Sequence, residues 1–329
     1  MHLYTADSRV LHLGNVANTA FNAVSWARQT GRNWALRPIP AAPSLASPSA
    51  WLARGTDAAD YLLGAPRPDL AHIHYGPNGY YGELKRAPYV LHLHGTDLRQ
   101  DLHRPLIGNL EKLALQRADA VIVATPDLLP AARELRPDAV WIPNALPTQT
   151  FLSASAHQPK HAPVSTPPTV FFSARWDDSK GGPGLVELAR DLIAEGVSVV
   201  GVDWGTYSTQ ASAVGVHLMP LLSPTKFVSA LRGADLVVGQ FASGSLGISD
   251  LEAMSTGVPL VGHVTNDAES SAPLLNRTLN EAGPAVLSAL ADSGKSKNLG
   301  EAAQKWVLTS RSPEATVRAT EDVYRSVLG

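Results

Sequence analysis

The sequence predicts an α/β protein of two domains, and three features of its pattern support this prediction. Short apolar runs alternate with longer segments of helical period, which is typical of parallel sheets covered by helices. The chain has 329 residues, about twice a common domain size of roughly 150 residues. Residues 153–168 are rich in Ser, Ala and Pro and lack a hydrophobic period, so we expect an extended connector there.

In the first half, six strands are predicted to alternate with helices. The expected strands are His2–Thr5, Trp34–Pro38, Leu70–His74, Tyr89–His94, Ala120–Ala124 and Ala139–Pro143. A helix is expected from about Asn18 to Gln29, because Asn favours the position just before a helix and Gly31 follows its end. Another helix is expected at about Pro105–Gln116.

The second half repeats this alternation. The expected strands are Thr169–Ser173, Val197–Val202, His217–Met219, Leu236–Gln240 and Pro259–Gly262. The expected helices are Gly184–Glu195, Pro224–Leu231, Gly247–Thr256 and Pro284–Asp292, the last with Pro at its first position. Two final helices are expected between Glu301 and Leu328, broken near Ser310–Pro313. We therefore expect domains at 1–152 and 169–312, with the last helix, 313–329, returning to the first domain.

The composition excludes several classes of function. The formal net charge is -2 and the pI about 6.6, so the chain has no basic field for nucleic acid. It has no cysteine, which excludes disulfides, thiolate metal sites and Cys nucleophiles. The amino terminus has no leader pattern and no long apolar run occurs, so we expect a cytoplasmic protein. Lys and Arg are scattered, so peripheral membrane contact is left open without support.

Two cations follow the predicted strand Thr169–Ser173. The segment FFSARWDDSKGG places Arg175 just after the strand and Lys180 five residues later, before two glycines. Ligands bind at the carboxyl ends of parallel strands, a helix start adds positive potential, and Gly lets the backbone approach closely. The loop therefore suits a diphosphate. A solvated turn in which Arg175 pairs with Asp177 or Asp178 explains the same residues.

A second segment, GSLGISDLEAMSTGVPLV, places a glycine-containing loop before a helix and an apolar strand after it. The helix is expected to begin near Gly247, where its free amide N–H groups suit an anion. Glu252, about one turn further on, can accept hydrogen bonds from a ribose diol. The alternative is that Glu252 is an exposed helix residue.

In their order and separation, the two segments resemble the carboxyl-terminal domain of retaining glycosyltransferases of family 4 (group 1), which have the GT-B fold of two Rossmann-like domains facing each other across a cleft. The resemblance implies that Arg175 and Lys180 contact the diphosphate of a nucleotide-sugar donor. It also implies that Glu252, in an EAM-x-x-G-x-P pattern, binds the ribose. Further donor contacts are expected from Gly244, Ser245, Leu246 and Gly247. UDP is the commonest donor nucleotide that the resemblance implies.

The first half resembles the amino-terminal domain of the same family. DLAHIHYG and YVLHLHGTD are similar to two of its strands, and WIPNALPTQTF to the segment that closes it, with Ala145 where the family usually has Gly. His94 is the position implied to reach the cleft. A His at the end of a strand can bond a sugar hydroxyl through Nε2 while the backbone holds Nδ1. The alternative is a His satisfied inside the core.

Two loops of the first half are candidates for the acceptor side or the donor phosphate. LHLGNVANTAFN places Gly14, Asn15 and Asn18 where the family has a glycine-containing loop, although its usual Gly-Gly pair is Gly14-Asn15 here. A turn with an Asn helix cap explains these residues equally well. In YGPNGYYG, Tyr75 and Asn78 follow a strand and could line an acceptor pocket. Solvent-facing turn residues are the favoured alternative there.

One position departs from the family pattern. The family carries a second Glu eight residues before the ribose Glu, close to the donor sugar, and this chain has Gly244 there. We expect backbone N–H groups of the Gly244–Gly247 stretch to hold the sugar hydroxyls instead.

We therefore expect a retaining, metal-independent hexosyltransferase with a catalytic set of His94, Arg175 and Lys180. Arg175, Lys180 and the helix start would stabilise the leaving diphosphate. No Asp-x-Asp segment ends a strand and no His/Asp/Glu cluster has ligand spacing in the sequence, so we expect no metal and no cofactor besides the donor. The acceptor, whether small molecule, glycan or lipid-linked, is unidentified. The alternatives are an inactive homologue acting as a binding or scaffold subunit and a GT-B nucleotide-sugar epimerase.

Overall fold

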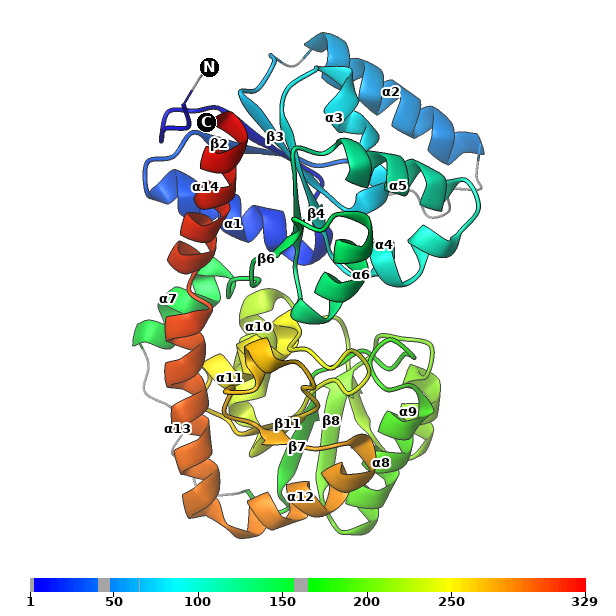
Figure 1. The fold of residues 1–329 in the computed structure, drawn as a ribbon. Coiled ribbons are helices and arrows are strands. Elements are labelled where there is room, and N and C mark those ends of the chain that lie inside the picture. The colour runs from blue at the N-terminus through cyan, green and yellow to red at the C-terminus, as the bar shows by residue number, and fades with distance from the viewer. Residues whose placement is uncertain (1–2, 41–47, 65, 157–164) are drawn as a thin grey trace. The chain divides into compact units, whose positions relative to one another are not determined.

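A computed structural model describes residues 3–40, 48–64, 66–156 and 165–329. Within these ranges the chain forms two compact units, residues 1–147 with 313–329 and residues 148–312. Each unit has a six-stranded parallel sheet in the described residues, with strand orders β2-β1-β3-β4-β5-β6 and β12-β11-β10-β7-β8-β9 (Figure 1). No helix in the described ranges combines the length and the apolar character that a membrane crossing requires.

The first unit contains the amino-terminal sheet and seven α-helices of the described residues. Its strands are β1 (Val10–Leu13), β2 (Trp34–Arg37), β3 (Leu70–His74), β4 (Tyr89–Leu93), β5 (Ala120–Val123) and β6 (Val140–Trp141). Its helices are α1 (Thr19–Gln29), α2 (Pro48–Gly64), α3 (Tyr80–Leu84), α4 (Thr96–Arg99), α5 (Ile107–Arg117), α6 (Leu129–Leu135) and α14 (Pro313–Leu328).

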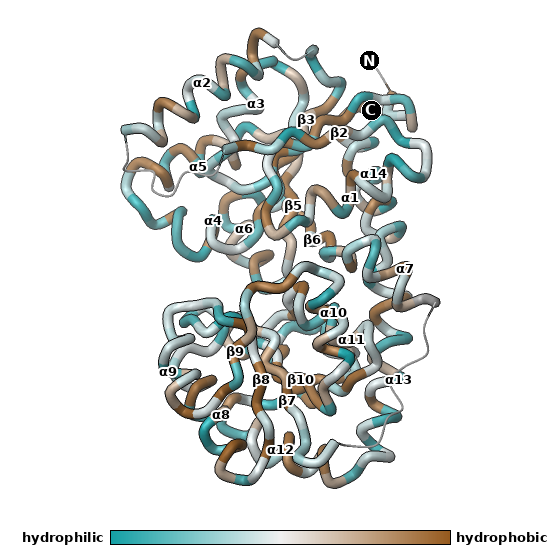
Figure 2. The backbone as a smooth tube through the Cα atoms, turned by 180° about the vertical axis from the view of Figure 1, so that it is seen from behind, coloured by the Kyte–Doolittle hydropathy of each residue, from teal (hydrophilic) through white to brown (hydrophobic). Residues whose placement is uncertain are grey.

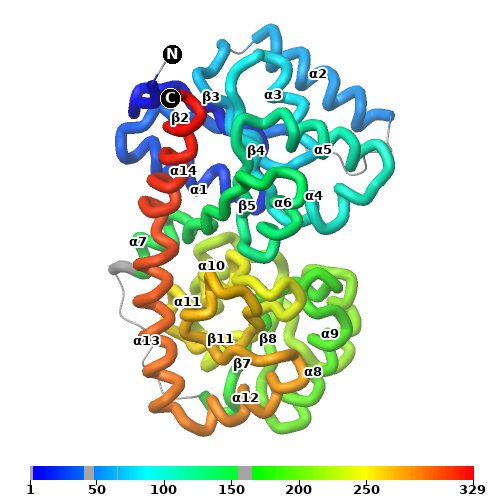
Figure 3. Tube along the Cα trace, in the orientation of Figure 1, coloured from blue at the N-terminus to red at the C-terminus, as the bar shows by residue number. Residues whose placement is uncertain are grey.

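Helices cover both faces of the first sheet. On one face α1 and α14 lie side by side (Figure 3), and Val317, Tyr324 and Leu328 of α14 pack with residues of β1 to β5. These positions recur at helical spacing, so they form one apolar stripe. On the other face α2, α3, α5 and α6 bury a second core. The last helix therefore belongs to the amino-terminal unit through packing with its sheet.

The second unit contains the other sheet and the remaining helices. Its strands are β7 (Thr169–Phe172), β8 (Ser198–Val202), β9 (His217–Met219), β10 (Leu236–Val238), β11 (Leu260–Gly262) and β12 (Leu275–Asn276). Its helices are α7 (Thr148–Ala156), α8 (Pro183–Ala194), α9 (Ser208–Ala213), α10 (Pro224–Gly233), α11 (Ile248–Ser255), α12 (Leu279–Ala291) and α13 (Ser293–Ser310). The sheet strands are mostly hydrophobic in Figure 2, as expected for strands buried on both faces.

The first predicted strand was placed wrongly. Residues 3–5 are not in a strand, and β1 is Val10–Leu13, which pairs with both β2 and β3. The first residue of the predicted strand, residue 2, lies outside the described residues. Val10 and Leu13 are fully buried, and burial between two neighbouring strands outweighs the β-propensity of the exposed amino terminus.

Three other local predictions need correction. The connector expected at 153–168 begins within α7, and residues 157–164 lie outside the described residues. Pro284 lies inside α12, which begins after Thr278 because Thr278 and Glu281 form a capping box. Asn18 precedes α1 but has φ 59 and no side-chain cap bond. Instead the Asn15 side-chain oxygen accepts the Phe21 N–H at 3.1 Å.

Candidate functional site

The first unit carries five histidines on one face of its sheet. The register of β1, β3 and β4 pairs His12 with His72 and His74 with His92, and alternation places His94 on the same face as His92. This is the face that α14 covers. His12, His72, His74 and His92 are buried, whereas His94 is partly exposed. We refer to these five residues as the histidine ladder.

Hydrogen bonds join the ladder edge to edge. His12 Nδ1 and His74 Nε2 are 3.0 Å apart, and His74 Nδ1 and His94 Nε2 are 2.9 Å apart. In a parallel row, His72 Nε2 and His92 Nδ1 are 3.1 Å apart. The rings of the two rows stack on each other, with centroids 4.5 Å apart for His92 and His94.

Burial keeps the ladder neutral. It lowers the pKa of His12 and of His94 to about 3. Burial, followed by the proximity of the other imidazoles, lowers the pKa of His72, His74 and His92 well below the ordinary value. A charged imidazole would lose its hydration in this buried environment.

His94 lies where the sequence predicts, just after β4, but it is oriented differently. Its Nε2, which we expected to face a sugar hydroxyl, is bonded to His74. Nδ1 is therefore the nitrogen left for a ligand, and no partner for it is recorded among the described residues. Asp97 fixes the backbone here by accepting the His94 N–H at 2.8 Å and the Gly95 N–H at 2.6 Å.

The residues of the two candidate loops in the first unit differ in their contacts. Gly14 lies against β3, where a Cβ would meet the His74 carbonyl oxygen at 3.1 Å and the Asn78 side-chain nitrogen at 3.3 Å. Asn78 is buried and donates to that carbonyl at 2.8 Å, so it serves the backbone rather than solvent. Asn15 donates to the Asn18 side chain at 3.1 Å. The Tyr75 hydroxyl is turned to Asp101. The structure thus brings Gly14 and Asn78 to the end of β3.

In the second unit, Arg175 follows β7 and is partly exposed. Its Nε lies 3.1 Å from the Asp177 carboxylate, and its Nη2 donates to the Ser179 hydroxyl at 3.2 Å. The guanidinium lies over the Trp204 ring, 4.9 Å from its centroid. The pairing with Asp177 that the sequence offered as an alternative is present. An ion pair with a side chain 38% exposed is weak enough to be exchanged for a phosphate.

Lys180 is tied to the end of β10. Its Nζ donates to Gln240 Oε1 at 2.7 Å, and the Gln240 amide in turn donates to the Ser245 carbonyl. Gln240 therefore links the predicted phosphate-binding lysine to the loop before α11. Sequence reasoning missed this residue, because a Gln at a strand end carries no signal of its own.

The loop of Gly244, Ser245, Leu246 and Gly247 is built around a buried carboxylate that the sequence did not reveal. Glu269, 3% exposed, accepts the Leu246 N–H at 3.0 Å and pairs with Arg311 at 3.0 Å. Asn266 donates to the Gly244 carbonyl at 2.8 Å and to Glu269 at 3.1 Å. We name Glu269, Asn266 and Arg311 the loop anchor. Asn266 three residues before Glu269 is a capping pattern visible in the sequence, but Arg311 is brought in by α13 alone.

Gly244 cannot be replaced by the family's Glu without a rearrangement. Its φ is +65, and a Cβ would lie 2.2 Å from Thr265 Oγ1. The expectation that the amides of this stretch are free for sugar hydroxyls is wrong for two of them. The Leu246 N–H donates to Glu269 and the Gly247 N–H donates to Asp250 at 2.8 Å.

Two carboxylates of α11 are buried. Glu252 is 7% exposed, with the Thr150 hydroxyl 3.5 Å from its Oε1, and burial raises its pKa to about 7. It is therefore not the exposed helix residue of the alternative interpretation. Burial also raises the pKa of Asp250 to about 6, against the opposing effects of the Gly247 N–H and Lys180. Oδ1 of Asp250 has no hydrogen-bond partner in the described residues.

From the sequence we expected no cluster with metal-ligand spacing, and the structure corrects this expectation. Strand pairing brings His12, His72 and His74, and likewise His74, His92 and His94, to positions where ligand nitrogens lie within 4.8 Å of one another. The nitrogens that join His12 to His74 and His74 to His94 are engaged in hydrogen bonds. The absence of a metal requirement stays a prediction.

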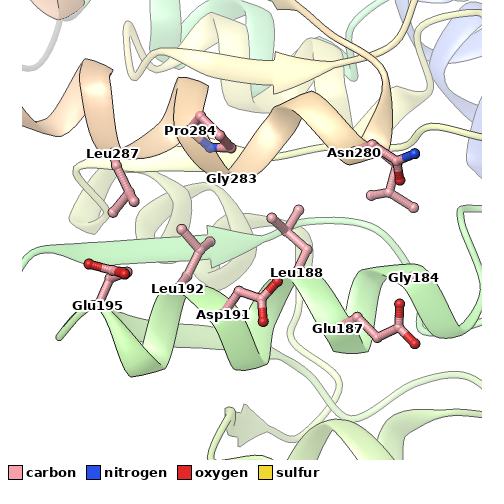
Figure 4. A pocket seen from close by; sticks show the side chains of 11 residues that line it. Gly184, Glu187, Leu188, Asp191, Leu192, Glu195, Asn280, Gly283, Pro284 and Leu287 are labelled. Carbon is pink, nitrogen blue, oxygen red and sulfur yellow. The ribbon is translucent and has the colours of Figure 1, made fainter.

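A surface groove lies apart from these residues. It runs between α8 and α12, where Leu188 and Leu192 point toward α12 and Leu287 points toward α8 (Figure 4). Its lining carries three acidic side chains, Glu187, Asp191 and Glu195, and none of the predicted site residues.

Comparisons with known sequences give a family match and a curated relative. The family described as Glycosyl transferase 4-like domain matches residues 16–145. The chain is 28% identical over 265 residues to a 2-deoxystreptamine N-acetyl-D-glucosaminyltransferase from Streptomyces fradiae, an alignment that covers 65% of this chain and 59% of that protein. The chain thus spans less than two thirds of the length of this curated relative.

Comparisons with solved structures give fold matches that cover nearly the whole chain. A UDP-forming α,α-trehalose-phosphate synthase from Burkholderia xenovorans matches with TM-score 0.70 at 14% identity over 98% of this chain and 100% of that chain. Sucrose-phosphate synthase from Thermosynechococcus elongatus matches with TM-score 0.69 at 16% identity over 96% and 98%. Anabaena HepE in complex with UDP-glucose matches with TM-score 0.68 at 14% identity over 97% and 100%. At these identities the three structures establish the shared fold.

Proposed function

We propose that the chain, which has the GT-B fold, is a GT4-like (group 1) glycosyltransferase. In this proposal it transfers a sugar from a UDP-sugar to an acceptor hydroxyl, with retention of the anomeric configuration and without a metal ion. The observation that carries the proposal is the arrangement at the strand ends of the second unit. Arg175 and Lys180 follow β7, and Gln240 connects Lys180 to the loop that leads into α11.

The chemistry of this region suits a leaving diphosphate. Arg175 is held by an exchangeable ion pair, and its stacking on Trp204 sets the plane of the guanidinium. Lys180 supplies a second positive charge. Hydrogen bonds from positioned cations stabilise the charge that develops as a diphosphate departs, and they do so without a metal ion.

Glu252 is proposed to bind the ribose. Burial makes a carboxylate costly when it is ionised, and two ribose hydroxyls would supply the hydrogen bonds that Thr150 alone does not. The pKa of about 7 then implies that UDP affinity weakens as the pH falls below 7, because the protonated form offers fewer acceptors.

The donor assignment is tested by calorimetric titration of UDP into the full chain. Arg175→Ala and Lys180→Ala are each expected to weaken the affinity about 10- to 100-fold, which corresponds to loss of charge-assisted hydrogen bonds of roughly 1.5–3 kcal/mol. Lys305→Ala removes an exposed lysine of α13 and serves as the matched control. Wild-type affinity in both site variants would refute the assignment.

Turnover is tested separately with UDP-glucose and UDP-N-acetylglucosamine, because relatives of this chain are named for complexes with UDP-glucose or for N-acetylglucosaminyl transfer. Product with an α-linkage, formed equally well in excess chelator, is the expected result.

A second candidate is a binding subunit without turnover, which Gly244 favours because the loop excludes the family's carboxylate. UDP binding with neither transfer nor hydrolysis across a broad acceptor panel would select that candidate.

A further inference from the structure

The histidine ladder continues through a tyrosine of the last helix. The Tyr324 hydroxyl lies 2.5 Å from His72 Nδ1 and 3.2 Å from His12 Nε2, and the Tyr324 side chain is fully buried. The two rows of imidazoles are therefore joined at one end. In order, the groups of the continuous chain are His94, His74, His12, Tyr324, His72 and His92.

The protons along such a chain are not independent. A neutral imidazole has one N–H donor and one lone-pair acceptor, and a hydroxyl has one proton to donate. Each of the five links needs one donor and one acceptor, so the proton position on one ring dictates the position on the next. Two arrangements satisfy all links and also use the hydroxyl proton, and they run in opposite directions. In a third, the Tyr324 oxygen would accept from both His72 and His12, and the buried hydroxyl proton would be left without a partner, which is costly. The low pKa of His12 and His94, about 3 in each case, keeps those two rings neutral at pH 7.

The buried end of the chain selects between the two directions. His92 Nε2 is buried and has no hydrogen-bond partner in the described residues. In one arrangement this atom carries an N–H, and in the other it is a bare lone pair. Buried N–H groups without a partner are rarer in proteins than acceptors with unused lone pairs. The favoured arrangement therefore has the proton of His92 on Nδ1, donating to His72.

From that end the direction follows link by link. His72 donates from Nδ1 to the Tyr324 oxygen, and the Tyr324 hydroxyl donates to His12 Nε2. His12 donates from Nδ1 to His74, and His74 donates from Nδ1 to His94 Nε2. Because His94 Nε2 is then an acceptor, its single proton is on Nδ1. This is the nitrogen for which no partner is recorded among the described residues.

We propose that this hydrogen-bonded chain holds His94 as the Nδ1–H tautomer, so that the end of β4 presents a fixed hydrogen-bond donor to an oxygen atom of the substrate, and that Tyr324 and His92 are positioning residues acting through His94. His94 does not act as a general base, because its Nδ1 has no lone pair to offer. The ligand atom it selects is an acceptor oxygen, of a sugar hydroxyl or a phosphate. The role toward substrate rests on the proposed transferase function, whereas the tautomer does not.

Nitrogen NMR of the 15N-histidine-labelled full chain tests the tautomer without substrate. Long-range correlations from the ring carbon-bound protons distinguish a protonated from a bare ring nitrogen. For wild type at pH 7, we expect a single tautomer of His94 with protonated Nδ1 and bare Nε2. Protonated Nε2 with bare Nδ1 would overturn the proposal, even in a chain that transfers sugar.

Tyr324→Phe tests the coupling, since it removes the one hydroxyl that joins the two rows. His12 Nε2 then loses its donor, and we expect His94 to lose its single tautomer and populate both forms. The matched control is Tyr4→Phe, whose hydroxyl accepts from Trp34 and donates to Glu321 near the same helix without touching the ladder. An unchanged His94 spectrum in folded Tyr324→Phe would refute the coupling.

Once an acceptor is known, kinetics separate the two levels of the proposal. Tyr324→Phe is expected to raise the KM for the acceptor about five-fold or more while the UDP affinity of the second unit stays within two-fold of wild type. If neither wild type nor the variant bound UDP, the proposed function would be refuted, whereas the tautomer result would still hold. Unchanged acceptor KM with an altered tautomer would show that His94 does not contact the acceptor.

Discussion

Each of the two units contains a six-stranded parallel sheet in the described residues, but the two units stabilise polar groups near their strand ends in opposite ways. In the first unit, neutral imidazoles bond to one another across β1, β3 and β4. In the second unit, charged groups are paired or held by amides, as in Glu269 with Arg311 and in Lys180 with Gln240. The same topology therefore supports a network that excludes charge and one that depends on it.

This difference has a consequence for pH. Burial lowers the pKa of the ladder histidines, so protonation at acidic pH destabilises the first sheet. Burial raises the pKa of Asp250 and Glu252, so it is rising pH that charges the second site. In both cases the low dielectric opposes the charged form, and the chemistry of the side chain sets the direction.

The largest expected effect is acid destabilisation of the first sheet. Unfolded His has a pKa near 6.5, so the unfolded chain binds more protons as the pH falls, and the stability that the ladder provides at pH 7 is lost below about 6.5. For a histidine whose pKa is shifted to about 3, the free energy of unfolding falls by on the order of 2 kcal/mol as the pH is lowered from 7 to 5. Hydrogen exchange, corrected for intrinsic rates, should show β1, β3 and β4 opening at pH 5 before β7 and β10. Uniform exchange in both sheets would contradict the comparison.

Among the substitutions in the second unit, removing the ion pair of the loop anchor should cause the largest loss of stability. Arg311→Ala leaves Glu269 buried without its ion-pair partner, and Glu269 is 3% exposed. The expected loss of stability is about 3–5 kcal/mol, measured by denaturant unfolding followed through the tryptophans. Arg325→Ala removes a side chain 54% exposed, whose ion pairs are with Glu321 and Asp322, and should cost less than about 1 kcal/mol. Equal losses in the two variants would count against the anchor.

One carboxyl group of the first unit, that of Glu111, has a raised pKa like the carboxyl groups of Asp250 and Glu252 in the second unit. Glu111 is fully buried, neither of its oxygens has a partner in the described residues, and burial raises its pKa to about 8. The folded state retains this proton where the unfolded state has lost it, so its contribution is lost as the pH rises toward 8. The free energy of unfolding of Glu111→Gln should therefore rise by about 3 kcal/mol relative to that of wild type between pH 6 and pH 9. A stability difference that is constant across this pH range would refute the assignment.

The smallest expected effect is at Gly244. Gly244→Ala places a Cβ 2.2 Å from Thr265 Oγ1 in a backbone with φ +65, so we expect a loss of about 1–3 kcal/mol together with weaker UDP binding. Gly233→Ala is the matched control, because nothing lies within 4 Å of a Cβ there and its φ is not positive. Thermal unfolding and UDP titration of both variants check this. A neutral Gly244→Ala would show that the loop adapts.

Sequence reasoning located most elements of both sheets because buried parallel strands are short, apolar and separated by helical periods. It failed where local preference and packing disagree. Residues 3–5 were predicted as part of a strand but have no partner strand in the described part, whereas Val10–Leu13 pairs on both sides. Pro284 looked like a helix start, yet the capping box at Thr278 begins the helix earlier.

The fold class, the family resemblance and the candidate positions Arg175, Lys180, Glu252 and His94 could all be predicted from sequence, because they follow from motifs in which residue type and spacing are local. Which atoms of these residues are available to a ligand depends on contacts made in the folded structure. Strand register placed five histidines in bonding contact, α14 supplied Tyr324, and α13 supplied Arg311 to the loop at Gly244. Such contacts join residues up to 312 positions apart. Hydrogen-bond direction within a buried network depends on every member at once, which no local pattern encodes.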